Sequence, residues 1–506
     1  MPSALLVAVT SHIATDVASA PFIWIVPLAL FLLTFVLIFT DKPLVPLAAI
    51  YQAVPVLAGG ILLSKLFQLN FVVNIFIHIG FFFATALLYH HLLYTLRPEA
   101  KNLTKFYLWM SFGGVLGGIF SGLLAPYIFN SILEYPILVS MVMLAHPAII
   151  NATRKDWKTL GLPALIIAGV VTTAFALLQK SGMANTDRFI VPAIIIGAFF
   201  VTGAFRHNII RAIFIPFTFV LLALHGGNAF GTKFMRSFFG VDRISIEENG
   251  QFRVLSHGTT VHGASRIANA DGKPYLGAPI PLSYYHPDGV LAQTLKLLPE
   301  NAGGRDVGIV GLGAGAHVCN GKPTDRFTYF EIDSLVEKIA TDKSEFQFLS
   351  TCAPNLKIIL GDARLTLQDQ PQQFDYLLLD AFSSDSIPTH LLTREALKIY
   401  AAHLKPNGLL VFHISNRHME LETVVAALAQ DAGLVAKDRL LVSKTDNLAD
   451  AYSSEAMVMA KSGDTLAQFT PSVGWTDADP KSTAVWTDDY SNIPASIWRK
   501  YWNGAK

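Results

Sequence analysis

Charge and cysteine are both scarce in this chain of 506 residues. Only 15% of the residues are Asp, Glu, Lys or Arg, and the formal net charge of +1 gives no sign of a nucleic-acid partner. The two cysteines, Cys319 and Cys352, could form one disulfide, but the sequence favours two free thiols in a reducing compartment. The N-terminus lacks a basic segment and a small-residue cleavage site, which argues against a cleavable signal peptide.

The chain also lacks the residue spacing of a recurring metal site, so we expect no bound metal. Several histidines of the first half lie near the ends of predicted helices and are interpreted as interfacial residues. These are His78, His90, His91 and His146. His317 and His413, in the second half, are interpreted as structural side chains.

The few charges are unevenly distributed along the chain. They are sparse before Phe230 and ordinary after it. Because about 20 mostly apolar residues in a helix span a bilayer core, residues 1–228 are predicted to form a multi-pass transmembrane domain of about seven or eight helices. The candidate spans are about 20–40, 43–64, 71–95, 106–129, 132–151, 159–179, 188–205 and 208–226.

The second half has the pattern of an α/β domain. Apolar and polar residues alternate around Glu248-Asn249-Gly250, which predicts a hairpin in a small β-region at 229–300. In 301–506 apolar runs alternate with helical patterns, which predicts a doubly wound, mostly parallel, Rossmann-like sheet of the methyltransferase type. The expected strands are 307–310, 327–332, 356–360, 374–379 and 409–414, and the expected helices include 393–404 and 420–432.

A glycine-rich turn follows the first of these strands. Gly311, Gly313 and Gly315 permit a tight turn that approaches a ligand closely, and a helix after the turn would offer free N–H groups. The turn predicts a nucleotide-binding loop, although glycines at this spacing alone are a weak signal.

Acidic residues end the next three predicted strands. In such folds ligands bind at the carboxyl ends of the strands, so we expect an adenosine-containing cosubstrate there. Glu331 is placed to accept hydrogen bonds from ribose hydroxyls, and Asp362–Ala363 to receive an adenine amino group. Asp380 is placed to hold or deprotonate an attacking amine.

The segment from about 240 to 495 resembles the polyamine aminopropyltransferase (spermidine synthase) family. It is most similar to the bacterial branch in which membrane helices precede the enzyme domain. The matching stretches are HGTTVHG (257–263), YYHPDG (284–289), VGLGAG (310–315), FEID (330–333), GDAR (361–364), LDAF (379–382) and WTDDYSN (486–492).

The resemblance assigns roles to individual residues. It implies that Glu331 binds the ribose, Asp362 the adenine and Asp380 the acceptor amine. It also implies that Tyr285, which we group with Asp380 as catalytic, and His286 line the acceptor pocket. His262 is expected to bind substrate as well.

The chain departs from the family pattern at two acidic positions. The acid that the family carries before the last glycine of the loop is Ala314 here, and the second acid after Asp380 is Ser383, for which Asp385 could substitute. By resemblance, the loop acid pairs with the aminopropyl nitrogen of decarboxylated S-adenosylmethionine. Its loss relaxes discrimination against intact S-adenosylmethionine.

Three functions therefore remain open. The first is aminopropyl transfer from decarboxylated S-adenosylmethionine to an amine, with release of methylthioadenosine and no tightly bound cofactor. The second uses intact S-adenosylmethionine, either for cleavage to methylthioadenosine or for methyl transfer. The third is a membrane transporter or sensor that binds polyamine or nucleoside without turnover. The expected partners are an amine substrate, the lipid bilayer and a second copy in a homodimer.

Basic loop residues leave the orientation in the membrane open. Arg97–Lys105, Arg154–Lys158 and Arg206–Arg211 mark three loops as cytoplasmic by the positive-inside rule. Eight spans would then place the catalytic half outside, where its adenosyl cosubstrate is scarce. We therefore expect one candidate not to cross, so that the enzyme domain faces the cytoplasm from a bacterial inner membrane.

Overall fold

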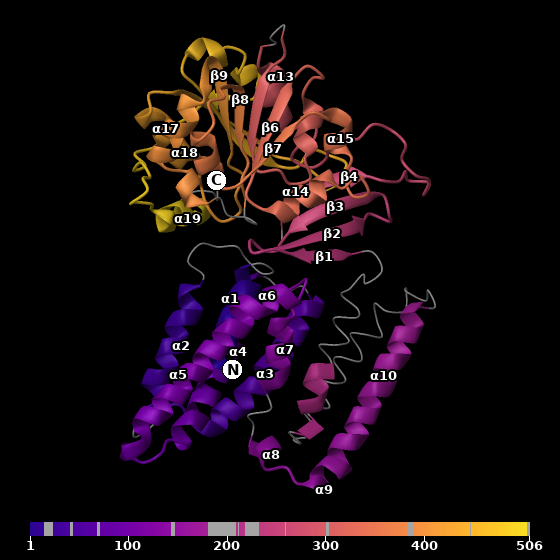
Figure 1. The fold of residues 1–506 in the computed structure, drawn as a ribbon, viewed down its shortest axis with the longest axis vertical. Coiled ribbons are helices and arrows are strands. Elements are labelled where there is room, and N and C mark those ends of the chain that lie inside the picture. The colour runs from indigo at the N-terminus through magenta and orange to yellow at the C-terminus, as the bar shows by residue number, and fades with distance from the viewer. Residues whose placement is uncertain are drawn as a thin grey trace. The chain divides into compact units, whose positions relative to one another are not determined.

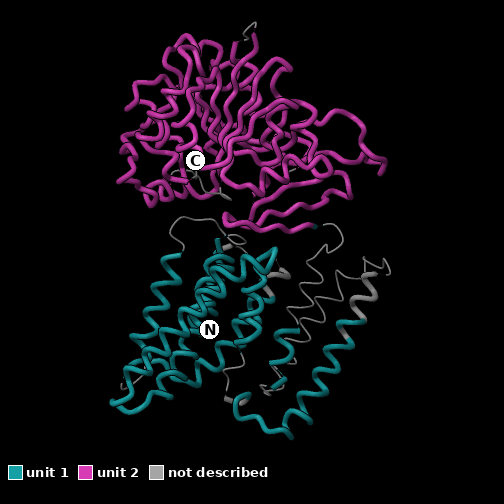
Figure 2. Tube along the Cα trace, viewed as in Figure 1, with its two compact units in different colours: residues 1–232 teal, residues 233–506 magenta. Residues whose placement is uncertain are grey.

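The structure, a computed structural model, consists of two compact units, residues 1–232 and 233–506 (Figure 2). It describes residues 1–14, 24–40, 44–67, 71–142, 147–180, 209–210, 212–217, 232–258, 260–299, 303–382, 388–445 and 447–502.

The first unit is helical (Figure 1). Its longer helices are α1 (Pro2–His12), α2 (Ile25–Ile38), α3 (Leu47–Phe67), α4 (Phe71–Thr95), α5 (Leu103–Ile119) and α10 (Leu162–Lys180). Its short helical segments are η2 (Ala100–Asn102), η3 (Phe120–Leu124), α6 (Ala125–Ile128), α7 (Glu134–Met141), α8 (Pro147–Ile150), α9 (Arg154–Asp156) and η5 (Trp157–Gly161).

Two helical stretches in the described part of this unit are long and apolar enough to cross a bilayer. They are Val72–Thr95 and Ala100–Ile128, and they overlap the predicted spans 71–95 and 106–129. Ile25–Ile38 and Leu47–Leu62 are apolar but shorter. The prediction of seven or eight spans is not confirmed. The stretch predicted at 132–151 is divided between α7 and α8, and 188–205 lies outside the described residues.

The second unit begins with a four-stranded antiparallel sheet. Its strands are β1 (Lys233–Arg236), β2 (Val241–Glu247), β3 (Phe252–His257) and β4 (Thr260–Arg266), in the order β1-β2-β3-β4. The predicted hairpin is confirmed between β2 and β3. Glu248, Asn249 and Gly250 all have positive φ, the backbone conformation that a tight turn between twisted strands requires.

An eight-stranded sheet forms the rest of the unit, in the order β12-β10-β11-β9-β8-β5-β6-β7. The strands are β5 (Asp306–Val310), β6 (Arg326–Glu331), β7 (Lys357–Leu360), β8 (Phe374–Leu379), β9 (Leu404–His413), β10 (Val435–Leu441), β11 (Ser454–Ala460) and β12 (Thr476–Asp477). Strands β5 to β9 pair in parallel, whereas β10, β11 and β12 pair antiparallel. The Rossmann-like, methyltransferase-type fold is therefore confirmed, with a sheet that is mixed.

Helices cover both faces of this sheet (Figure 1). They are α13 (Val290–Leu297), α14 (Ser334–Thr341), α15 (Phe348–Cys352), α16 (Ala363–Gln368), α17 (Arg394–Ala402), α18 (Glu422–Asp431) and α19 (Ile493–Trp502). Successive strand residues point to opposite faces, so Tyr376 and Leu378 belong to one buried cluster and Leu377 and Leu379 to the other. Burial on both faces explains why these strands read as continuous apolar runs.

The segment after the glycine turn is helical. The helix there is a short 3₁₀ helix of five residues, η7 (Ala316–Asn320). Cys319 in η7 is bonded to Cys352 in α15. The prediction of two free thiols was therefore wrong, because 33 residues separate the two cysteines and only the packing of η7 on α15 brings them together.

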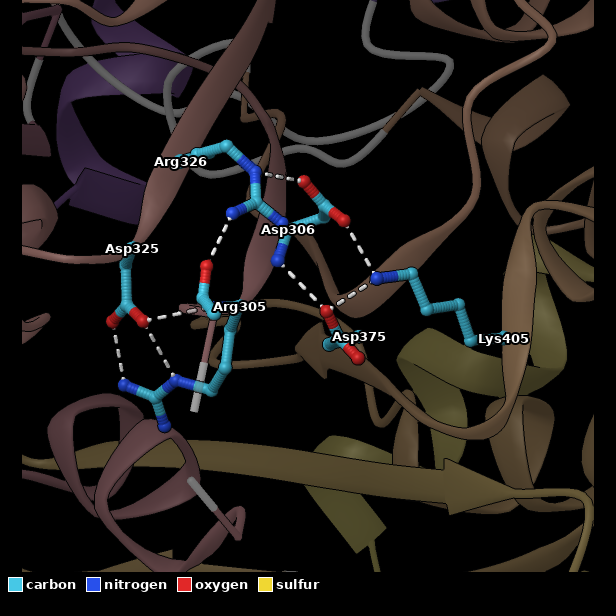
Figure 3. Close-up of polar contacts among 7 residues, drawn as sticks. Arg305, Asp306, Asp325, Arg326, Asp375 and Lys405 are labelled. Atoms are coloured by element: carbon cyan, nitrogen blue, oxygen red, sulfur yellow. Dashed lines mark hydrogen bonds and ion pairs between the residues drawn. The ribbon is translucent and has the colours of Figure 1, made fainter. Parts of the chain in front are cut away.

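Ion pairs lie at the amino ends of the parallel strands (Figure 3). Arg305 holds Asp325 through two side-chain hydrogen bonds of 3.0 and 2.6 Å. Asp306 lies between Arg326 at 2.7 Å and Lys405 at 2.6 Å, and Lys405 also contacts Asp375 at 2.7 Å. All of these acids face a cation.

Candidate active site

The glycine turn lies where the strand order of the large sheet reverses. β5 and β8 are neighbours, and their successors β6 and β9 lie on opposite sides of this pair. This is the switch point at which doubly wound folds bind ligands, outside the carboxyl ends of the strands. The turn leaves β5 there, and the segment after β8 begins with Asp380.

Two glycines of the turn are required by close packing of backbone on backbone. Gly311 has φ +95°, and a Cβ there would lie 2.3 Å from the carbonyl oxygen of Asp380. Gly313 has φ +53°, and a Cβ there would lie 2.5 Å from the carbonyl oxygen of His262. The next residue, Ala314, donates its N–H to that same carbonyl at 3.1 Å. The turn therefore joins the end of β8 to the small sheet.

Glu331 lies beneath the turn and is nearly buried. Its Oε2 accepts the backbone N–H of Leu312 at 2.8 Å, and its Oε1 accepts that of Asp333 at 2.9 Å. Burial raises the pKa of Glu331, although these backbone hydrogen bonds act in the opposite direction. Each carboxylate oxygen keeps further acceptor capacity, which a pair of neighbouring hydroxyls could use.

Asp362 has a structural role that was not predicted from the sequence. Its Oδ1 caps α16 by accepting the N–H groups of Arg364 and Leu365, at 2.9 and 3.2 Å. Its Oδ2 lies 3.0 Å from Nε2 of His390, a half-exposed residue of η8 (Thr389–Leu391). Only Oδ2 of Asp362 is therefore available to a ligand. A ligand that binds this oxygen would have to displace His390.

Asp380 is at the centre of a buried hydrogen-bonded group. Its Oδ2 accepts the hydroxyl proton of Tyr285, and its Oδ1 lies 2.5 Å from Nδ1 of His413. Burial and then the charge of Asp380 raise the pKa of Tyr285 well above its ordinary value, so the phenol stays protonated as the donor. Tyr285 and Asp380, which the sequence analysis grouped as catalytic residues, are therefore in direct contact.

His413 links Asp380 to a serine. Its Nε2 lies 2.8 Å from Oγ of Ser415, which also accepts the backbone N–H of Glu455 at 2.8 Å. Because the serine oxygen accepts that bond, its own proton is free to point at Nε2. We therefore assign the His413 proton to Nδ1, facing Asp380. This leaves Nε2 as a proton acceptor on the far side of the ring.

A cavity of about 190 Å³ lies over the glycine turn and the strand ends. All three carboxylates line it, together with Gly311, Gly313 and Ala363. Aromatic and apolar side chains complete its walls, among them Phe239, Phe330 and Ile332. The predicted cosubstrate residues therefore line one cavity, apart from Gly315. Gly315 packs against Leu349 instead, where a Cβ would lie only 2.3 Å from the leucine side chain.

A second cavity of about 370 Å³ adjoins the first and shares three lining residues with it, His262, Tyr284 and Phe382. His413 and Ser415 line the second cavity. At its wall, burial and the nearby charge of Glu422 raise the pKa of Glu455 to about 7. The Asp380–His413 pair therefore lies between the two cavities, the first beside the glycine turn and the second beside β11.

The remaining predicted substrate residues are placed as follows. His262 lines both cavities. His286 instead accepts the N–H of Asp288 at 3.1 Å and lines neither cavity. Ser383 and Asp385 lie outside the described residues.

Sequence reasoning missed Tyr284, Phe382, His390 and Ser415, and it took His413 for a structural side chain. Tyr284 and Phe382 stand inside stretches that had been singled out, at 284–289 and 379–382, so their neighbours in sequence were a usable signal. The position of His413 opposite Asp380 depends on the pairing of β8 with β9, which no local pattern shows.

Part of the chain is similar in sequence to a known protein. No family model matches it. The polyamine aminopropyltransferase of Vibrio vulnificus (strain CMCP6) is 35% identical over 109 residues, which are 20% of this chain. The match spans only 35% of that relative's length.

Two solved spermidine synthases align with about half of the chain. A probable spermidine synthase from Corynebacterium glutamicum ATCC 13032 aligns with 50% of this chain and 95% of its own, at 16% identity and a TM-score of 0.35. The Thermotoga maritima spermidine synthase aligns with 55% and 88%, at 13% identity and a TM-score of 0.35. The predicted resemblance to the spermidine synthase-like family is confirmed, and the sequence match to the Vibrio protein carries it.

Proposed function

We propose that the chain is a membrane-anchored aminopropyltransferase that uses decarboxylated S-adenosylmethionine and releases methylthioadenosine. The observation that supports this most is the convergence of Glu331, Asp362 and Asp380 on one cavity beside the glycine turn. The likeness to a polyamine aminopropyltransferase over 109 residues agrees with it. The adenosyl compound is a cosubstrate that binds and leaves in every cycle.

The first cavity would hold the donor. Glu331 has acceptor capacity left on both oxygens, so it suits the two ribose hydroxyls. Asp362 would accept the adenine amino group on Oδ2, in place of His390. The glycine turn brings backbone to the nucleoside without side chains in the way.

The reaction itself needs little acid assistance. The acceptor nitrogen attacks the methylene carbon next to the sulfonium, the carbon–sulfur bond breaks, and its electrons return to sulfur. Methylthioadenosine leaves neutral, and the positive charge passes to the new secondary ammonium, which then loses one proton. The protein must align the two reactants and receive that proton.

The second cavity would hold the acceptor amine, and the Asp380–His413 pair would receive the proton that the product ammonium loses. His413 offers Nε2 through Ser415 on the side of this cavity, and Asp380 stabilises the imidazolium that forms. Tyr285 fixes the other oxygen of Asp380. In this scheme Asp380 positions and stabilises the base instead of taking the proton itself, which revises the role expected from sequence.

The first unit would anchor the enzyme in a bacterial inner membrane through Val72–Thr95, Ala100–Ile128 and further spans. The Cys319–Cys352 disulfide favours an oxidising compartment for the second unit, in contrast to the cytoplasmic placement expected from the sequence. A homodimer and an amine acceptor, polyamine or other, complete the proposed partners.

The test uses purified full-length protein in detergent with decarboxylated S-adenosylmethionine and putrescine, and resolves the products by mass. Equimolar methylthioadenosine and spermidine would support the proposal. Binding of the nucleoside with no product from any amine would contradict it and favour the sensor.

A second candidate is cleavage or methyl transfer with intact S-adenosylmethionine. The observation that favours it is Ala314, which is fully buried against Gly263, where the family carries a loop acid. Without that acid, nothing in the turn repels the carboxylate of the intact donor. Replacing the donor in the same assay decides between them, since methylthioadenosine alone indicates cleavage and S-adenosylhomocysteine indicates methyl transfer.

A further inference from the structure

Three carboxylates converge at the antiparallel edge of the large sheet, away from the glycine turn. Glu422 is in the first turn of α18, Asp438 is in β10 and Glu455 is in β11. β10 and β11 pair with Leu440 opposite Glu455, so Asp438 and Glu455 are diagonal neighbours on one face of the sheet. One oxygen from each of the three carboxylates lies within 4.8 Å of the other two.

The basic side chains that the structure describes leave this group without an ion pair. In the part of the chain that the structure describes, none of the three carboxylates forms an ion pair with lysine or arginine. Lys481 and Lys500 act on the group only from beyond ion-pair distance. The adjacent Glu420, by contrast, is bound by Arg499 at 2.8 Å. Three acidic groups are thus gathered without a cation in contact, and burial together with their mutual repulsion raises the pKa of Asp438 to about 8.

An unsatisfied oxygen provides a second, independent observation. Asp438 is only 8% exposed, and its Oδ1 has no hydrogen-bond partner. A buried carboxylate oxygen without a partner is costly, and buried polar atoms in folded proteins are nearly always satisfied. This oxygen can therefore accept a ligand from outside the protein.

We propose that Glu422, Asp438 and Glu455 bind a hard divalent cation such as Mg²⁺, Mn²⁺ or Ca²⁺. The ligand set is made of oxygen alone, which suits these ions and not zinc or copper, which prefer nitrogen and sulfur. Metal–oxygen bonds of about 2.0–2.6 Å place ligand oxygens up to about 5 Å apart, in agreement with the spacing of the carboxylates.

The position of the site gives the cation a structural consequence. Glu455 lines the second cavity, from which an ion and its remaining water ligands can enter. Its backbone N–H holds Ser415, which in turn contacts His413. A cation that joins α18, β10 and β11 would therefore fix the wall that carries Ser415. The proposal does not depend on the transferase assignment.

The experiment is a titration of chelator-treated full-length protein with MnCl₂, followed by electron paramagnetic resonance of free Mn²⁺, with MgCl₂ and CaCl₂ as competitors. We expect one ion bound at micromolar to submillimolar concentration, in the range of oxygen-ligand sites of modest charge. Asp438→Asn should weaken that binding at least tenfold. Asp464→Asn, which removes an exposed acid of η9 (Gly463–Leu466), should leave it unchanged.

Three results would overturn the proposal. They are no bound Mn²⁺ at millimolar concentration, equal binding by Asp438→Asn and the parent chain, and displacement by 1,4-diaminobutane but not by Mg²⁺ or Ca²⁺, which would indicate an ammonium site. Thermal unfolding of each metal-free variant shows that it is folded. Should Asp438→Asn fail that control, Glu455→Gln replaces it under the same criteria.

Discussion

At the amino ends of β5, β6 and β8, acidic side chains meet arginine or lysine, whereas at the carboxyl ends of β6, β7 and β8 they meet neither. Arg305 and Asp325 are almost fully buried together. Asp380 is equally buried, yet its partners are a phenol and an imidazole. Neutralised acids stabilise a fold, whereas acids left without a counter-cation remain available to bind and move protons. The predictions below test this division, from the largest effect to the smallest.

Breaking the buried pair at the amino end should cost the most free energy of unfolding. Arg305→Met leaves Asp325 buried without its partner, and such losses amount to about 3–5 kcal/mol. Activity per folded molecule should not change. The measurement is the unfolding transition of the second unit by near-UV circular dichroism. Arg326→Met is the matched control, because its pair with Asp306 is half exposed and worth about 0–1 kcal/mol.

Asp380→Asn should instead reduce activity and leave the stability of the fold nearly unchanged. It removes the charge that supports His413 and Tyr285, so turnover should fall by about 10²–10⁴-fold. Affinity for methylthioadenosine and the unfolding temperature should stay close to those of the parent chain. Steady-state kinetics with equilibrium binding measure both quantities. An unchanged rate would remove Asp380 from the mechanism.

His413→Gln removes the proposed base itself, so turnover should fall by a similar factor, about 10²–10⁴-fold. Ser415→Ala serves as the comparison, because it keeps the imidazole and removes the hydroxyl that contacts Nε2 and accepts the N–H of Glu455. An unchanged turnover in His413→Gln would leave His413 a structural residue.

The two ends should also differ in the sign of their pH dependence. At the amino end, burial raises the pKa of Asp325, but the hydrogen bonds and charge of Arg305 outweigh it and lower the pKa overall. This stabilisation is therefore lost as the pH falls below about 4. Glu331 has a raised pKa, so its contribution to stability falls as the pH rises from its unfolded pKa through its folded one.

Ribose binding by Glu331 needs the ionised form, so nucleoside affinity should rise over that same window, by about two- to tenfold. Glu331→Gln should flatten this dependence. Calorimetric titration of methylthioadenosine between pH 4.5 and 8 checks it, and an identical slope in both proteins would assign the effect to another group.

Local patterns were enough for the parts of the site that lie within one segment. Gly311 and Gly313 stand out because their backbone conformation and close packing admit no side chain. Glu331, Asp362 and Asp380 stand out because apolar runs end just before them, and the carboxyl ends of parallel strands share one edge. The helix after the turn is the short 3₁₀ helix η7, whose five residues are too few for a helical period to show its type.

The amino-acid sequence by itself determined the division into an apolar and a polar half, the α/β class of the second half and the edge of the sheet at which the glycines and acids gather. Each follows from hydrophobic periodicity and backbone sterics, which act over a few neighbouring residues. The tertiary structure alone decided that His413 faces Asp380, that Cys319 reaches Cys352 and that Asp438 joins Glu422 and Glu455. Those contacts join segments far apart in the chain, and they are set by strand register and helix packing, which no local pattern encodes.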